Sequence, residues 1–174
     1  VGRFNSAKKI DEIINLINFC ANKNRNLNFA IATSSDISKE ISRLTNHALL
    51  QTKIINKPRL SDNEINKIVS ESIVVLALQP HITQSGVLPV CFMNGTPLIA
   101  RDIEGFSQFV DHESNGMLVS ADLDHGQIFE SIRYIDSNIE SMSKKCRESY
   151  QQVFSIEQFE SYYEWLIEKD CSEI

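Results

Sequence analysis

The chain has 174 residues, of which 42% are hydrophobic and 23% charged, and its formal net charge is −6. These values are typical of one globular domain with its own core, and they disfavour a general nucleic-acid binder because no basic cluster offsets the negative charge. No apolar run reaches the roughly 18 residues that cross a bilayer, and the scattered cysteines and histidines lack metal-ligand spacing. We therefore expect one cytoplasmic domain over residues 1–174, without a metal site or nucleic-acid partner.

The first residues read as the end of a strand. Val1-Gly2-Arg3-Phe4 has no initiator methionine, so we expect a fragment cut at a domain boundary, with a partner domain upstream. A polar turn follows, and apolar residues then recur at helical spacing from Ile10 to Ala21, which predicts a helix.

Strands and helices then alternate along the chain. Ser61 and Glu64 stand at capping-box spacing and mark the start of a helix that runs to Ser70. Alternation of this kind predicts an α/β fold, here a Rossmann-like doubly wound parallel sheet flanked by helices, with further helices at the C-terminus. The other predicted elements are strands at Asn28–Ala32, Thr52–Ile55, Ile73–Leu78, Pro97–Ala100 and Asn115–Val119, helices at Ser38–Leu44 and Ser85–Asn94, and two or three amphipathic helices between Asp124 and Lys169, one of them breaking near Asp136–Asn138.

The segment Thr83–Pro89 carries the strongest functional signal. A buried strand ends at Leu78, the chain turns, and a helix begins at Ser85-Gly86. Ser85 can cap that helix, and Gly86 lets a ligand approach the backbone closely. Free N–H groups and the positive dipole end at a helix N-terminus attract anions such as phosphate, and the carboxyl edge of a parallel sheet is where α/β folds hold nucleotides. An ordinary strand–loop–helix connection is the plainer alternative.

Two cations near the start of the chain fit the same interpretation. Arg3 leaves the first predicted strand at the ligand-binding edge, and Lys8 lies in the loop or first helical turn that follows. Facing a helix N-terminus, the two side chains would clamp a diphosphate, Arg with a forked donor and Lys with a point charge. The alternative is that Arg3 and Lys8 are ordinary loop residues whose charges are solvated.

Six segments follow one another in a characteristic order: Val1–Phe4 with Lys8, Leu60–Glu64 before Ile73–Leu78, Thr83–Pro89, Asn94–Ala100, Asp102–Val110 and Asn115–Val119. Their succession resembles the C-terminal, donor-binding domain of GT-B glycosyltransferases of the large retaining family 4 (group 1). The similarity spans nearly the whole chain, and it lies in the order of the segments rather than in one motif.

The resemblance implies a nucleotide-sugar donor, by default a UDP-sugar, with GDP left open. It implies no bound metal or other cofactor, because cations and a helix dipole stabilise the leaving diphosphate. No catalytic residue is assigned, since the domain supplies electrostatics and orientation rather than a nucleophile. The residues implied at the diphosphate are Arg3, Lys8, Ser85, Gly86 and Val87, and those near the donor sugar or nucleotide are His81, Thr83, Gln84 and Val90.

The resemblance also implies partners outside this chain. The acceptor, a glycan or lipid-linked sugar in cell-surface polysaccharide synthesis, would bind the absent N-terminal domain. The full-length protein would be cytoplasmic, and peripheral association with the inner face of the membrane is left open. We expect the isolated fragment to fold but to transfer nothing.

Some residues depart from the family's pattern. Two glutamates usually found eight positions apart would fall at Ile82 and Val90, and a usual Gly-Gly pair becomes Glu104-Gly105, followed by Gln108 in place of Glu. A carboxylate at Glu104 would repel a diphosphate unless it is turned away. These departures keep two alternatives open: a degenerate, non-catalytic nucleotide-binding or interaction domain, and one half of a sugar-nucleotide 2-epimerase.

Overall fold

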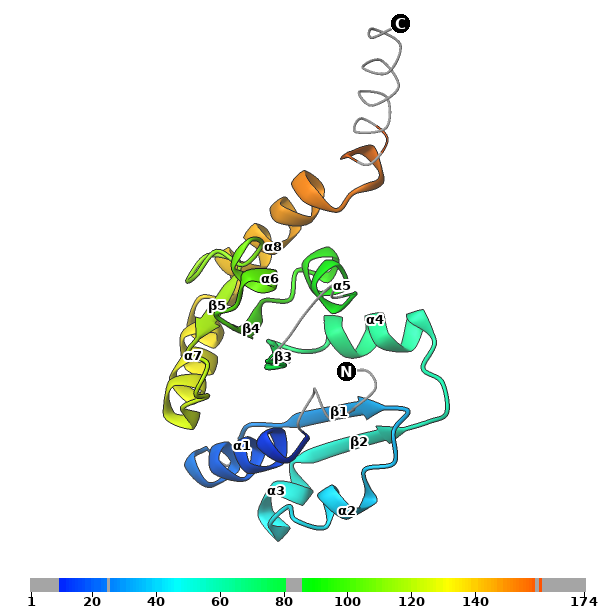
Figure 1. Cartoon of the computed structure of the whole chain (residues 1–174), viewed down its shortest axis with the longest axis vertical. Helices are drawn as coiled ribbons and strands as arrows, with labels where there is room; N and C mark the ends of the chain where they lie inside the picture. Colours follow the sequence, from blue (N-terminus) through cyan, green and yellow to red (C-terminus); the bar gives the residue numbers. More distant parts are fainter. Residues whose placement is uncertain (1–9, 25, 81–85, 159, 161–174) are drawn as a thin grey trace, which may run out of the picture.

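The computed structural model describes residues 10–24, 26–80, 86–158 and 160, and its helices and strands alternate along the chain (Figure 1). Arg3, Lys8, His81, Thr83, Gln84 and Ser85 lie outside the described residues. In chain order the elements are α1 Ile10–Lys23, β1 Phe29–Thr33, α2 Ser38–Ile41, α3 Asn46–Leu50, β2 Thr52–Asn56, α4 Asp62–Ser70, β3 Val75–Ala77, α5 Val87–Asn94, β4 Leu98–Arg101, α6 Glu104–Ser107, β5 Gly116–Val119, α7 His125–Ser137 and α8 Ile139–Val153.

All strand pairs of the described chain are parallel, and they form two sheets. β1 pairs with β2, with Phe29 opposite Thr52. β4 lies between β3 and β5, so that Leu98 is opposite Val75 on one side and Gly116 on the other. The predicted α/β fold of parallel strands flanked by helices is therefore confirmed, but the described strands do not form one continuous sheet.

Helices cover both faces of the three-stranded sheet. On one face Ile99 belongs to an apolar cluster with residues of α1 and α7, and on the other Leu98 and Ala100 pack with residues of α4 and α5. Every residue of β4 is consequently buried, as expected for a parallel strand covered on both sides. α8 contributes to both clusters, through Met142 and Cys146 respectively.

The helix α1 packs against both sheets. Its Ile14 and Ile17 belong to the cluster around β1, α2 and α3, whereas its Leu16 and Cys20 belong to the cluster on the three-stranded sheet. One amphipathic helix thus uses neighbouring apolar stripes to hold the two sheets side by side.

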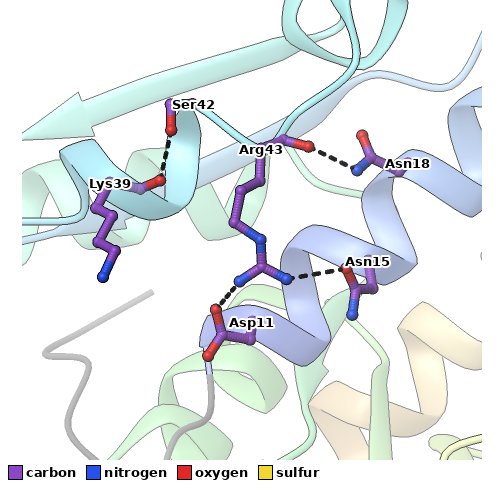
Figure 2. A network of polar contacts seen from close by, with 6 residues as sticks. All are labelled: Asp11, Asn15, Asn18, Lys39, Ser42 and Arg43. Atoms are coloured by element: carbon purple, nitrogen blue, oxygen red, sulfur yellow. Dashed lines mark hydrogen bonds and ion pairs between the residues drawn. The ribbon is translucent and has the colours of Figure 1, made fainter.

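Polar contacts strengthen the link between α1 and the chain after α2 (Figure 2). Arg43 forms an ion pair with Asp11, and its Nη2 donates to Asn15 Oδ1 at 3.4 Å. Asn18 donates from Nδ2 to the Arg43 carbonyl at 3.0 Å and accepts from the Thr45 N–H at 2.9 Å. In the same view, the Ser42 hydroxyl donates to the Lys39 carbonyl at 2.7 Å and closes the turn after α2.

The predicted bounds agree with the structure to within a few residues, with two kinds of error. The helix predicted over Ser38–Leu44 ends already at Ile41, and the short helices α3 and α6 were not predicted. The break near Asn138 is confirmed, since it separates α7 from α8. The Ser61 cap is confirmed as well: its hydroxyl accepts from the Glu64 N–H, and the Glu64 carboxylate accepts from the Ser61 N–H.

Candidate functional site at the carboxyl edge of the three-stranded sheet

The predicted donor site lies where β3 ends and α5 begins. β3 ends at Ala77, the described chain continues to Pro80, and it resumes at Gly86, the residue before α5. Of the predicted site residues, the structure describes Gly86, Val87 and Val90. The contacts of the other predicted site residues, and the proposed capping by Ser85, therefore stay predictions.

Gly86 is exposed and takes the N-cap position of α5, so the helix starts at Val87, one or two residues later than predicted. Its φ of −63° and ψ of −15° are open to any residue, and a Cβ placed there would meet nothing within 4 Å. No side chain caps this end among the described residues. Within the described residues, the first N–H groups of α5 therefore have no side-chain partner, and such a helix end can attract an anion.

The other end of α5 is fixed tightly. Gly95 follows the helix with a φ of +72°, and the guanidinium of Arg147 lies over it, with Cζ 2.4 Å from where a Cβ would stand. Arg147 also donates from Nη2 to the Asn94 carbonyl at 3.3 Å. Together with the buried side chains of Leu88 and Phe92, these contacts hold the axis of α5 in a fixed direction.

Val90 lies one turn into α5. Its side chain is half-buried and packs against the apolar cluster that includes Phe92 and Phe106. Its carbonyl accepts from Asn94 Nδ2 at 2.8 Å. A valine side chain cannot accept a hydrogen bond from a ribose hydroxyl, so any ribose contact must come from elsewhere.

Arg101, which the sequence analysis did not single out, joins three segments at this edge. It is the last residue of β4 and is 6% exposed. Nε donates to the Leu78 carbonyl at 2.6 Å, Nη1 to the Ala121 carbonyl at 2.7 Å, and Nη2 to Glu12 Oε2 at 2.7 Å. The guanidinium therefore connects the chain after β3, the chain after β5 and the first turn of α1. In the sequence, the one sign of this role was a charged residue, Arg101, directly after the apolar run Leu98–Ala100.

The segment after β4 presents acidic side chains to solvent. Glu104 is the first residue of the short helix α6, and both Glu104 and Asp102 are exposed. Phe106 anchors α6 in the core. Burial thus fixes the position of α6, while the exposed Glu104 carboxylate is free to turn away from a bound anion.

Within the described ranges, no group of three or more His, Cys, Asp or Glu side chains could hold a metal ion. None of the helices described there is both long and apolar enough to span a bilayer.

The sequence matches the family model of the glycosyl transferases, group 1, over residues 1–153. The chain belongs to this family. The match covers α1 through α8 and includes both the proposed phosphate helix α5 and the Arg101 contacts. Group 1 glycosyltransferases are thus confirmed as the family that the order of sequence segments indicated.

Solved glycosyltransferase structures share the fold. TarM from S. aureus, solved as a mutant in complex with UDP and other ligands, superposes with a TM-score of 0.79 at 18% identity, over 95% of this chain and 34% of that one. Pneumococcal O-GlcNAc transferase GtfA, in complex with UDP and GlcNAc, gives 0.75 at 20% identity, over 95% and 34%. The C-terminal domain of LpcC from Francisella tularensis gives 0.75 at 14% identity, over 90% and 84%.

These coverages define which part of a glycosyltransferase the chain corresponds to. It spans about a third of TarM and GtfA but most of the isolated LpcC domain, so its fold is that of the C-terminal domain of GT-B enzymes. A search of curated proteins finds no match.

Proposed function

We propose that this chain is the donor-binding domain of a retaining glycosyltransferase and that the diphosphate of a UDP-sugar binds at the N-terminus of α5. The observation that carries the proposal is the start of α5 at the exposed Gly86, which no described side chain caps, at the carboxyl edge of a parallel sheet in a chain of this family. Such an edge is the usual ligand site of α/β folds.

The charges needed for a diphosphate come from the chain itself. Arg3 and Lys8 would neutralise the phosphates opposite the N-terminus of α5. Gln84 and Ser85, the residues just before Gly86, would lie beside the bound donor. Glu12, four residues after Lys8, is fixed by Arg101, so the start of α1 has a defined place at this edge. Stabilisation of the leaving diphosphate by these groups requires no bound metal.

The acceptor and the transfer step belong to the full-length protein. We propose that a glycan or lipid-linked acceptor binds a second domain upstream and that the enzyme acts in cell-surface polysaccharide synthesis, in the cytoplasm or at the inner face of the membrane. This domain would orient the donor and stabilise the departing UDP, and alone it would transfer nothing.

One observation favours a second candidate, a degenerate domain that binds nucleotide without turnover. The half-buried Val90, packed against an apolar cluster, stands where the family's pattern places a ribose-binding glutamate. Sugar transfer by the full-length protein would exclude this candidate, and interconversion of free UDP-sugars without transfer would instead identify a 2-epimerase.

Calorimetric titration of the full-length protein with UDP and with GDP tests the proposal. We expect UDP to bind with a Kd between micromolar and millimolar, roughly −8 to −4 kcal/mol. The double variant Arg3→Ala, Lys8→Ala should abolish binding. The matched control Arg133→Ala, Lys39→Ala removes the same charge from α7 and α2 and should bind like the wild type. Binding of neither nucleotide by the wild type would contradict a donor site.

A further inference from the structure

Arg101 ends β4, the central strand of the three-stranded sheet, at the carboxyl edge. Its Nε donates at 2.6 Å to the carbonyl of Leu78, the first residue after β3. Its Nη1 donates at 2.7 Å to the carbonyl of Ala121, two residues after β5. One guanidinium thus fixes the chain where it leaves both neighbouring strands. The segment that begins at Leu78 leads to α5, whose N-terminus is the proposed phosphate site.

The third group that Arg101 binds is a carboxylate at the start of α1. Nη2 lies 2.7 Å from Glu12 Oε2, and the side chains of Arg101 and Glu12 are 7% and 33% exposed. An unpaired carboxylate in this first helical turn would repel an anion bound at the same edge of the sheet. The ion pair therefore offsets a repulsive charge, and it also fixes the start of α1 relative to β4.

The burial of Arg101 decides between two roles that an arginine could have at this edge. An arginine at an anion site usually offers its forked donors to the ligand. Here the side chain is almost fully buried, and Nε, Nη1 and Nη2 each donate to a protein oxygen. The guanidinium consequently acts through Glu12, Leu78 and Ala121 rather than by touching a ligand itself.

We propose that Arg101 is a positioning residue for donor binding, which sets the start of α1 and the chain after β3 relative to the N-terminus of α5. This role rests on the proposed function, because it concerns the same diphosphate site. Groups that bind a ligand must be held close to their productive places, so a small displacement at this edge weakens binding in a protein that stays folded. Lysine at position 101 keeps the cation but cannot serve three acceptors in fixed directions.

Calorimetric titration of the full-length protein with UDP compares the same substitution at two arginines. We expect Arg101→Lys to raise the Kd for UDP about 10-fold. The matched control is Arg43→Lys, because Arg43 pairs with Asp11 on the same turn of α1, but in an exposed ion pair. This control should change the Kd less than about 2-fold. An unchanged Kd in Arg101→Lys, or equal changes in the two variants, would overturn the positioning role.

A second comparison separates positioning from a general loss of stability. Ile135→Ala opens a cavity at a fully buried residue near the end of α7. Because α7 begins after β5 and its 13 residues extend about 20 Å, Ile135 lies away from the carboxyl edge. Ile135→Ala should lower the urea midpoint as Arg101→Lys does, yet keep the Kd for UDP within about 2-fold of the wild type. If binding weakened in proportion to lost stability in both variants, the role would be general and the positioning role overturned.

The sign of a third effect distinguishes positioning from charge repulsion. If Glu12 acted on the ligand through its charge alone, Glu12→Ala would tighten UDP binding. A positioning role predicts a Kd raised roughly 5-fold. Because Glu12 is partly exposed, this variant tests the role even if Arg101→Lys fails to fold. Tighter or unchanged binding would overturn the positioning role and leave the donor site intact, whereas a wild type that binds no UDP would overturn both.

Discussion

At the scale of single residues, Arg101 contributes most to the carboxyl edge. Its three donors satisfy two carbonyls and a carboxylate from segments far apart in the sequence. A planar fork is suited to such a junction, and lysine would be a poor substitute because it cannot serve the three acceptors in fixed directions.

We predict that Arg101→Met destabilises the protein by about 3 kcal/mol, because it removes a buried cation from its carboxylate and leaves the Leu78 and Ala121 carbonyls without their donor. Urea unfolding measures the loss. The control Arg133→Met breaks an exposed pair with Glu130 and should cost less than about 1 kcal/mol. If both variants lost the same free energy of unfolding, the buried contacts of Arg101 would contribute no more to stability than an exposed ion pair.

Two glycines at opposite ends of α5 should respond differently to alanine. Gly95→Ala forces a left-handed φ and a clash with Arg147, so we predict a loss of roughly 1–2 kcal/mol. Gly86→Ala meets open space at a helical φ and should change stability by less than about 1 kcal/mol. Thermal unfolding measures both. A Gly86→Ala variant that keeps its stability but loses UDP binding would support close approach of the ligand to the backbone.

At the scale of elements, α4 shows how local sequence fixes a helix start. Ser61 and Glu64 form the capping box, and Lys57 pairs with the same carboxylate. The Lys57 ammonium, followed by the hydrogen bonds from Ser61, lowers the pKa of Glu64 from 4.5 to about 2.

A lowered pKa predicts the pH dependence of this contribution. Since the unfolded chain binds the proton more tightly, Glu64 stabilises the fold above pH 4.5, and this contribution is lost as the pH falls toward 2. The stability difference between wild type and Glu64→Gln should therefore be constant from pH 7 to about 5 and shrink below it. Urea unfolding at several pH values measures it. A difference that stays constant down to pH 2 would contradict the contacts of Glu64.

The longer helices and the strands could be predicted because each shows its own apolar spacing or cap within a few neighbouring residues. The apolar spacing of α1 and the box at Ser61 need no knowledge of the rest of the chain. α3 and α6 were missed because helices of four or five residues make little more than one turn and cannot repeat an apolar spacing. Thr45 caps α3, and its hydroxyl accepts from the Ala48 N–H at 3.2 Å. A threonine at this position is a local sign of a helix start.

At the scale of the whole molecule, strand pairing and the Arg101 contacts could not be predicted. Both depend on residues brought together from distant parts of the chain, such as Glu12 with Arg101. The sequence pattern placed a helix start at Ser85-Gly86, within two residues of the start of α5. The packing of Val90 and the two separate sheets emerge only from the fold.

The buried thiols report on the integrity of the core. Burial raises the pKa of Cys20 to about 11 and the pKa values of Cys91 and Cys146 to about 12. We predict that at pH 8 these three thiols react with a thiol reagent at least about 100-fold more slowly than in urea, because both access and the thiolate fraction are low. Peptide mapping of the label assigns each site. Rapid labelling of Cys91 or Cys146 in the native protein would show that α5 and α8 separate in solution.

The most direct test of the donor site is a crystal structure of the full-length protein with UDP. The account predicts the diphosphate at the start of α5, with the Val87 N–H donating to a phosphate oxygen at roughly 2.7–3.2 Å, and with Arg3 and Lys8 on its other side. UDP bound anywhere else in the molecule would contradict the assignment of α5 as the phosphate helix.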